Sequence, residues 1–438
     1  MSRRADIAFA CACAAFAAAC GWLANSRLIP DHVGYWHWWQ YPLEPHWTPL
    51  LLGALAALGL AAWLARTRPA AGLALGSIAL AFALHLFMGR HFPMQVLTHY
   101  VTEAVNPAQS LRLALVDYEA AVAASFNPLF LDTKPPGLLV LHALPHATIA
   151  SLVDDVVMQW LLGGGLWWIV FHAAGAAIIA VLWRVVPREE KGDAAAWLAA
   201  GLWAASPSVV LLDMEFSTRL YPLLALGLWA VFRREDVTLA ESAAMGAAWA
   251  LMVWTGFSAG IMAIVPAVFL AARAAKDINR ALLLGMAFAA PVIVLHGALW
   301  AAVGYDPTAR MAKAFAAHRA EFGIDAMPAA MKLKMTLQAA AELLLSTGVL
   351  AVAFLWGLLR KRPGVDEWAT IALLVAMPLA GNLVSESARL WAFATPLMAV
   401  IAARAGVGPR AAAAAIAAQV ALNLLFLPVQ FWTYGKNM

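Results

Sequence analysis

Apolar runs close to the length of a membrane-crossing helix recur along the whole chain. A helix needs about 20 mainly apolar residues to cross a bilayer. Thirteen stretches approach that length: residues 6–24, 48–65, 70–89, 157–183, 194–212, 219–232, 238–254, 257–272, 281–302, 337–358, 368–384, 390–403 and 411–430. Of the 438 residues, 63% are hydrophobic and only 12% are charged. A water-soluble fold could not bury so much apolar surface. The sequence predicts an all-α polytopic membrane protein, one transmembrane domain over 1–438 with about 13 spans.

Lysine and arginine predict how these spans are oriented. Cytoplasmic loops of membrane proteins are enriched in both residues, and a cytoplasmic N-terminus places more than half of the 29 basic residues in short cytoplasmic loops. Arg3 and Arg4 then precede an uncleaved first helix, because further spans follow it. The stretch 138–153 is interrupted by Pro145 and two histidines. If it crossed, every later basic loop would move outside, so we expect it to lie in the interface or to enter the membrane part-way.

This orientation places the long polar loops on the extracytoplasmic face. They are 26–47, which is rich in Trp and His, about 90–156, and 304–336. In the two larger loops, Asn106-Pro107 and Asp306-Pro307 each supply an N-cap residue followed by proline at the first helical position. We therefore expect extracytoplasmic amphipathic helices along the bilayer surface, with 90–156 as a catalytic loop and 304–336 as a second long loop.

The stretch 99–137 combines carboxylates and cations beside the membrane. It contains Glu103, Asp117, Glu119, Asp132, Arg112 and Lys134. A carboxylate can activate a hydroxyl, and a nearby cation can stabilise a departing phosphate. Lys134 precedes two prolines that stiffen the chain. The stretch therefore has the residue types that a transfer reaction from a lipid phosphate would need.

Two later segments on the same face also pair acids with a cation. In the first, Asp213 and Glu215 precede Arg219; in the second, Glu386 precedes Arg389. A single group of this kind can be a membrane anchor, but three on one face favour a functional role. Asp213 and Glu215 could bind Mg²⁺ or Mn²⁺, although two carboxylates are too few to require a metal.

Other patterns indicate structural roles. The three cysteines all lie in the first apolar run, without metal-binding spacing. His172 and His296 lie within spans, where buried, hydrogen-bonded histidines are expected. The net charge of +4 is explained by cytoplasmic loops and does not indicate a nucleic-acid partner. The aromatic cluster at 35–47 fits an interfacial belt or a sugar-stacking surface. No zinc, P-loop or haem spacing is present.

The order of these motifs resembles that of a known family. HYVTEA, DTKPPG, SPSVVLLDMEFSTRLYPLLALGLW and SESARLWAFATPL follow one another over about residues 90–405. The pattern is similar to the GT-C superfamily of integral membrane glycosyltransferases, especially bacterial relatives of the protein-mannosyl and aminoarabinose transferases. The resemblance implies an enzyme of the bacterial cytoplasmic membrane with an extracytoplasmic active site. Its donor would be a polyprenyl-phosphate-linked sugar, and its acceptor a lipid, glycan or protein.

The resemblance also implies roles for individual residues. Glu103 would be the catalytic base, although the family more often has Asp, and Lys134 would meet the donor phosphate. Asp213 or Glu215 would form the second acidic motif. The remaining candidates for binding the donor phosphate or sugar are Glu386, Arg389, Asp132 and Tyr100. Two additional spans before the catalytic loop depart from the simplest family members.

Alternative interpretations predict other features. A transporter or flippase would need ionisable residues near mid-span and interrupted helices in two corresponding halves. A phosphoethanolamine transferase would need a periplasmic metal-binding domain. An enzyme similar to O-antigen ligases would need a basic extracytoplasmic loop with histidine, for which Arg310, Lys313, His318 and Arg319 are candidates.

Overall fold

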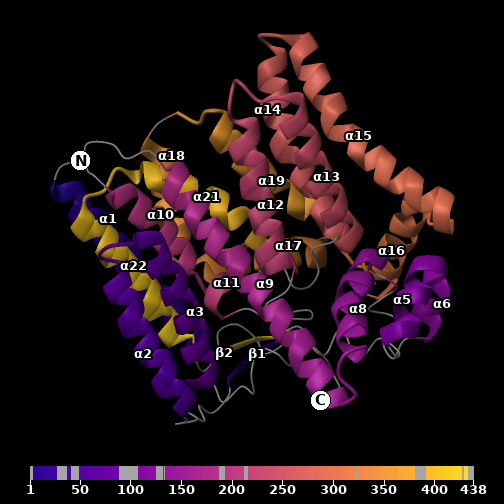
Figure 1. The fold of residues 1–438 in the computed structure, drawn as a ribbon. Coiled ribbons are helices and arrows are strands. Elements are labelled where there is room, and N and C mark those ends of the chain that lie inside the picture. Colours follow the sequence, from indigo (N-terminus) through magenta and orange to yellow (C-terminus); the bar gives the residue numbers. More distant parts are fainter. Residues whose placement is uncertain are drawn as a thin grey trace.

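A computed structural model shows a protein built almost entirely of packed helices (Figure 1). It describes residues 3–26, 37–40, 49–87, 107–124, 132, 134–186, 193–211, 216–321, 323–360, 362–379, 391–426 and 429–432. The helices of the first half are α1 (Arg3–Asn25), α2 (Pro49–Leu64), α3 (Pro69–Phe87), α5 (Pro107–Val116), α6 (Tyr118–Ala124), α8 (Pro136–Ala150), α9 (Val156–Val185), α10 (Ala194–Ala204) and α11 (Pro207–Val210). Those of the second half are α12 (Phe216–Phe232), α13 (Leu239–Thr255), η1 (Phe257–Ala263), α14 (Ile264–Ala274), α15 (Ile278–Val303), α16 (Pro307–Glu321), α17 (Ala329–Thr347), α18 (Val349–Arg360), α19 (Val365–Leu379), η2 (Ala392–Ala394), α21 (Thr395–Ala402), η3 (Ala403–Ala405) and α22 (Pro409–Leu425).

The prediction of a helical membrane protein is confirmed. Five stretches of described helix are long and apolar enough to cross a membrane: Arg3–Asn25, Pro69–Leu86, Leu161–Val185, Phe257–Ala274 and Ile278–Val303. A sixth is added if the bent pair of α17 and α18 counts as one span. Several other apolar helices have only 10–17 residues, so the full number of about 13 spans stays a prediction.

Two expected spans are interrupted helices. The single span expected at 337–358 is two helices, α17 and α18, which meet at an angle of 99°. Between them, Gly348 has φ 60° and ψ −133°, a conformation that essentially only glycine adopts. The span expected at 194–212 is broken between α10 and α11, because Pro207 begins a new helix and disfavours helical backbone in the residue before it.

Two short strands are a further departure from an all-α fold. β1 (His37–Gln40) pairs antiparallel with β2 (Val429–Trp432), so that His37 lies opposite Trp432 and Gln40 opposite Val429. The expected aromatic loop 26–47 therefore contributes one strand to a ribbon with the C-terminal segment. The two strands lie together at the lower end of the molecule in Figure 1.

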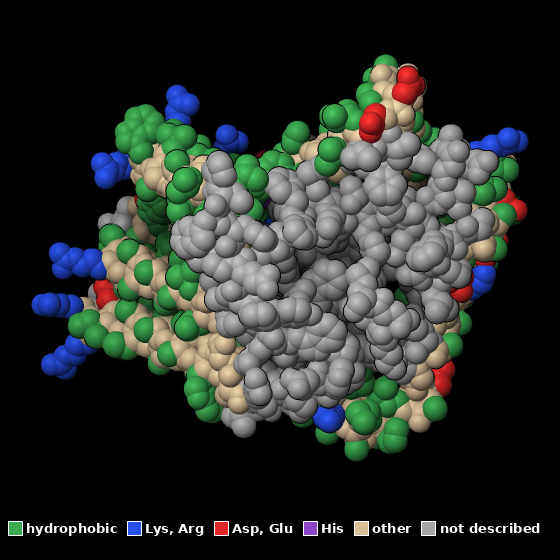
Figure 2. Space-filling view, turned by 90° about the horizontal axis from the view of Figure 1, so that it is seen from below, with side chains coloured by type: hydrophobic (Ala, Val, Ile, Leu, Met, Phe, Trp, Pro, Cys, Tyr) green, Lys and Arg blue, Asp and Glu red, His purple; other side chains and the backbone are tan. Residues whose placement is uncertain are grey.

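The centre of the bundle is tightly packed, and large apolar side chains are exposed on its flanks. Helix α10 is buried along most of its length, and Trp203, Trp229 and Phe393 are almost completely shielded from solvent. By contrast, α15 leaves large side chains such as Ile293 and Trp300 exposed. Figure 2 shows hydrophobic side chains over much of the described rim at the lower end. Exposed apolar flanks around a packed interior are what lipid-facing helices require.

Buried polar side chains donate hydrogen bonds to backbone carbonyls at the break between α10 and α11. Ser77 on α3 and Asn423 on α22 each donate a 2.7 Å hydrogen bond to a carbonyl at the end of α10. Arg219 on α12 donates to the carbonyl of Val209 on α11. An unpaired carbonyl inside a membrane protein is costly. These buried polar residues are therefore part of the packing of the interrupted helix.

Candidate functional site

Helix α16 of the second long loop lies against the first long loop. Its start is fixed by Asp306, whose Oδ1 accepts hydrogen bonds from the backbone N–H groups of Thr308 (2.8 Å) and Ala309 (3.0 Å). Gly304, with φ 71°, ends α15 and turns the chain into this cap. The expected helix at Asp306-Pro307 is thus present. The helix expected from Asn106-Pro107 is divided at Asp117 into α5 and α6. In Figure 1, α5, α6, α8 and α16 gather at one corner of the molecule.

Arg310 is the centre of this assembly, with only 4% of its surface exposed. Its Nη1 donates to Glu119 Oε1 (2.9 Å) and Asp132 Oδ1 (3.1 Å). Its Nε donates to the carbonyl of Lys134 (3.2 Å), and its Nη2 donates to the carbonyl of Asp132. The guanidinium also lies 4.9 Å from the ring centre of Tyr118. One side chain therefore connects α16 with α6 and with the DTKPPG segment.

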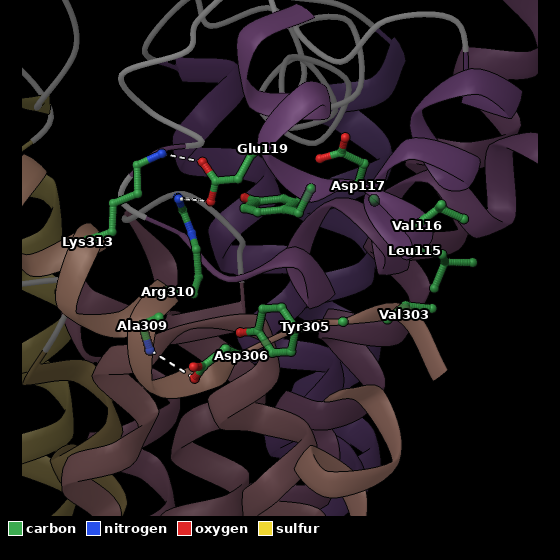
Figure 3. Close-up of a pocket in the computed structure, with 13 residues that line it drawn as sticks. Leu115, Val116, Asp117, Glu119, Val303, Tyr305, Asp306, Ala309, Arg310 and Lys313 are labelled. Atoms are coloured by element: carbon green, nitrogen blue, oxygen red, sulfur yellow. Dashed lines mark hydrogen bonds and ion pairs between the residues drawn. The ribbon is translucent and has the colours of Figure 1, made fainter. Parts of the chain in front are cut away.

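Lys313, one turn further along α16, adds a second cation. Its Nζ forms an ion pair with Glu119 and lies 3.4 Å from Asp132 Oδ1. The hydrogen bond to Glu119 raises the pKa of Lys313 above its usual value. Figure 3 shows Arg310 and Lys313 both directed toward Glu119. Because two cations meet two carboxylates, the cluster is close to electrically neutral.

A cavity of about 270 Å³ adjoins this cluster (Figure 3). Arg310 and Lys313 form part of its charged wall, and Leu115, Val116 and Val303 form part of its apolar wall. The cavity lies where the lipid-facing α15 ends, which is the depth of the phosphate groups if α15 spans the bilayer. An apolar wall beside a charged wall suits a molecule with both an apolar and a charged part.

Two tyrosines, Tyr118 and Tyr305, are among the residues that line the cavity. Tyr118 Oη donates to the carbonyl of Lys134 at 3.2 Å, and burial raises the pKa of Tyr118. The hydroxyl of Tyr305 is buried, and no other described residue lies in hydrogen-bonding position to it. Burial also raises the pKa of Tyr305. Both phenols therefore stay protonated at neutral pH and can donate hydrogen bonds.

The structure describes the position of only some of the predicted site residues, and their roles stay predictions. Asp132 and Lys134 lie together in the Arg310 cluster, and Asp117 lines the cavity and caps α6 by accepting from Ala120 N at 3.1 Å. The other predicted site residues lie outside the described residues: Glu103, Tyr100, Asp213, Glu215, Glu386 and Arg389. The convergence of Glu103, Lys134 and Arg389 on one substrate site stays a prediction.

The sequence did not reveal the role of Arg310. It drew attention to Arg310 and Lys313 only as basic residues of a ligase-like loop. The available signal was their i, i+3 spacing, which puts both on one face of α16. In the structure both are paired with carboxylates, and Arg319 pairs with Asp325. These three basic side chains are therefore not a free cationic surface.

Comparison with models of known protein families gives no match, and comparison with curated proteins gives none either. Within the described part of the chain, no group of three or more His, Cys, Asp or Glu side chains is arranged to hold a metal ion.

Proposed function

We propose that the protein is a GT-C-type glycosyltransferase that moves a sugar from a polyprenyl-phosphate donor to a lipid, glycan or protein acceptor. The observation that carries the proposal is the position of the Asp132–Lys134 segment beside a cavity with one apolar and one charged wall. A prenyl chain needs apolar contact and its phosphate needs cations. The motif resembling the family's donor-phosphate segment lies beside these two walls, and the proposal assigns the Lys134 side chain to the phosphate.

The proposed reaction is a single inverting displacement. Glu103 removes the proton of an acceptor hydroxyl, whose oxygen attacks the anomeric carbon of the sugar. The bond between that carbon and the phosphate oxygen breaks, and the polyprenyl phosphate leaves with the electron pair. Lys134 and Arg389 meet its negative charge, while Asp132, Tyr100, Glu386 and the acidic motif at Asp213 and Glu215 contribute to donor binding. General-base assistance of this kind typically contributes about 10²–10⁴ in rate.

The proposed location is the bacterial cytoplasmic membrane, with the site on the extracytoplasmic face. The contacts support the predicted sides. Near the N-terminus, Asp6 accepts a 3.1 Å hydrogen bond from Gly408 N. Asp6 is at the predicted cytoplasmic end of the first span, and Gly408 is in a predicted cytoplasmic loop. At the opposite end of α1, Asn25 donates to the carbonyl of Leu425 at 2.8 Å. Asn25 follows the predicted outer end of the first span, and Leu425 is in the predicted outer part of the last span.

The pairing of β1 with β2 supports an even number of membrane crossings in the chain between these two strands. Because β1 and β2 are hydrogen-bonded, they lie on the same side of a membrane. With 138–153 outside the membrane or only part-way in, twelve predicted spans separate the two strands; a crossing there would make the number odd. The helix found there, α8, has 15 residues and is about 22 Å long at 1.5 Å per residue, shorter than the ~30 Å hydrocarbon core.

The direct test is transfer by Glu103→Gln in membrane vesicles supplied with polyprenyl-phosphate sugars. We expect sugar transfer to be abolished, because the glutamine amide cannot accept the proton of the acceptor hydroxyl. The protein should remain folded. Lys134→Met should weaken donor binding. Glu235→Gln is a matched control, since Glu235 is an exposed carboxylate in a predicted cytoplasmic loop. Full activity of Glu103→Gln would remove Glu103 as the base and leave Asp132 and Asp117 as the next candidates.

A second candidate, transport of a lipid-linked substrate, is favoured by the interrupted helices. The breaks at α10/α11 and α17/α18 lie in different halves of the chain, and transporters use such breaks at substrate sites. Near the second break, both amide atoms of the fully buried Gln419 have no hydrogen-bond partner among the described residues. Movement of a fluorescent polyprenyl lipid across proteoliposomes, unchanged by Glu103→Gln, would support transport over transfer.

A further inference from the structure

The chain just before α8 depends on distant side chains to satisfy its backbone. Pro135 and Pro136 have no backbone N–H, so this stretch has few donors of its own. The carbonyl of Asp132 accepts from Arg310, and the carbonyl of Lys134 accepts from both Arg310 and Tyr118, at 3.2 Å each. The conformation of the segment is therefore fixed from outside, by α16 and α6.

Only arginine can make this set of contacts. Its guanidinium presents donors in a rigid plane, and three of its nitrogens are used for different partners. Nε and Nη2 reach the two carbonyls, while Nη1 reaches the carboxylates of Glu119 and Asp132. A lysine at this position would keep the charge, but its single nitrogen could not replace all of these contacts.

We infer that Arg310 is a positioning residue. By holding the backbone at residues 132 and 134, it sets where the Lys134 side chain leaves the chain, and it couples the second long loop to the first. The part of this inference that concerns Lys134 and a lipid phosphate rests on the proposed function. The coupling of the two loops rests on the described contacts alone.

Arg319→Lys is the matched control for Arg310→Lys. Arg319 is on the same helix and also forms an ion pair, with Asp325, through Nε at 2.9 Å. About half of the Arg319 side chain is exposed, and Asp325 lies in the same loop as Arg319. Tyr118→Phe is a milder second variant, because it removes only one of the two donors to the Lys134 carbonyl.

The first experiment measures coupling without assuming any activity. Hydrogen–deuterium exchange of the full-length protein in nanodiscs is followed in peptides that cover α6 and α16. We expect Arg310→Lys to accelerate exchange in both peptides, Tyr118→Phe to do so less, and Arg319→Lys to leave α6 unchanged. Exchange in Arg310→Lys equal to that of the unmodified protein would overturn the inference.

The second experiment asks whether Arg310 acts through Lys134. The probes are undecaprenyl phosphate and, as the phosphate-free control, undecaprenol, with binding followed by tryptophan fluorescence. Loss of one charge-assisted contact corresponds to roughly tenfold or more in affinity. We expect about that loss for undecaprenyl phosphate in Arg310→Lys, and no loss for undecaprenol. In a Lys134→Met background, Arg310→Lys should have little further effect, because the two changes act on one interaction.

The results of the two experiments distinguish failure of the proposed function from failure of the inference about Arg310. If the unmodified protein binds both probes equally while exchange responds as expected, the proposed function fails and the coupling of the loops stands. If Arg310→Lys weakens phosphate binding by the same factor with and without Lys134, the two residues act independently and the positioning role is refuted.

Discussion

Replacement of Gly137 by alanine tests the close contact that sets α8 against α13. Gly137 follows the two prolines of the DTKPPG segment. A Cβ placed there would lie 2.2 Å from the carbonyl oxygen of Trp254 and 2.6 Å from its ring. Because the oxygen belongs to the backbone of α13, it cannot rotate away. The helices would have to separate by about 0.8 Å to bring this contact to 3.0 Å, and such overpacking typically costs about 1–3 kcal/mol.

The assay is unfolding of Gly137→Ala by SDS titration in mixed micelles, followed through the fluorescence of the 20 tryptophans. Gly165→Ala on α9 is the control, because a Cβ at Gly165 meets no atom within 4 Å. We expect the free energy of unfolding to fall by about 1–3 kcal/mol for Gly137→Ala and not to fall for Gly165→Ala. If both variants are equally stable, the close packing of α8 on α13 is refuted.

Three further predictions concern the ion pairs, the helix break and the membrane sides. The hydrogen bond to Glu119 raises the pKa of Lys313 above 10.5, so this ion pair stabilises the folded protein fully below pH 10.5. The stabilisation is lost as the pH rises through the higher pKa that Lys313 has in the folded protein. Lys313→Met should therefore flatten the dependence of the melting temperature on pH above 10.5. Asn423→Leu should lower the free energy of unfolding by about 1–3 kcal/mol, measured by SDS titration, because a buried carbonyl at the end of α10 loses its donor. A cysteine at position 332 should react with a membrane-impermeant maleimide on intact cells, and one at position 276 only after permeabilisation; the reverse pattern would invert the proposed orientation.

The helical character of the chain follows from its apolar runs, because each run must satisfy its backbone internally in lipid. The two loop helices were also predictable, since Asp306-Pro307 and Asn106-Pro107 carry local start signals that do not depend on tertiary contacts. The helix observed at Pro307–Glu321 begins where that signal places it. Local rules therefore predicted where α5 and α16 begin, but not the division at Asp117 that starts α6.

The bend at Gly348 is a feature that local sequence rules could not predict. Ser346, Thr347 and Gly348 mark the position of the bend in the run 337–358, but a short Ser-Thr-Gly stretch inside an apolar run is a weak signal that many continuous helices also contain. The bend depends on tertiary packing: a Cβ at Gly348 would lie 2.7 Å from both the Gln419 amide nitrogen and a methyl group of Leu422 on α22. The contacts of Arg310 are likewise long-range, joining residues 176 to 191 positions apart. A single sequence contains no signal for such pairings.

Comparison of Arg219 with Arg310 shows that burial of an arginine in this protein does not by itself mark a substrate site. Each donates to backbone carbonyls of an interrupted segment, Arg219 to Val209 before the start of α12 and Arg310 to the chain before α8. The two differ in what else they contact. Among the described residues, Arg219 donates hydrogen bonds to backbone carbonyls, which is sufficient to explain its burial at a helix break. Arg310 also binds two carboxylates beside an open cavity, so a charged ligand in that cavity would compete directly with its partners. For this reason we assign a functional consequence to Arg310 and a structural one to Arg219.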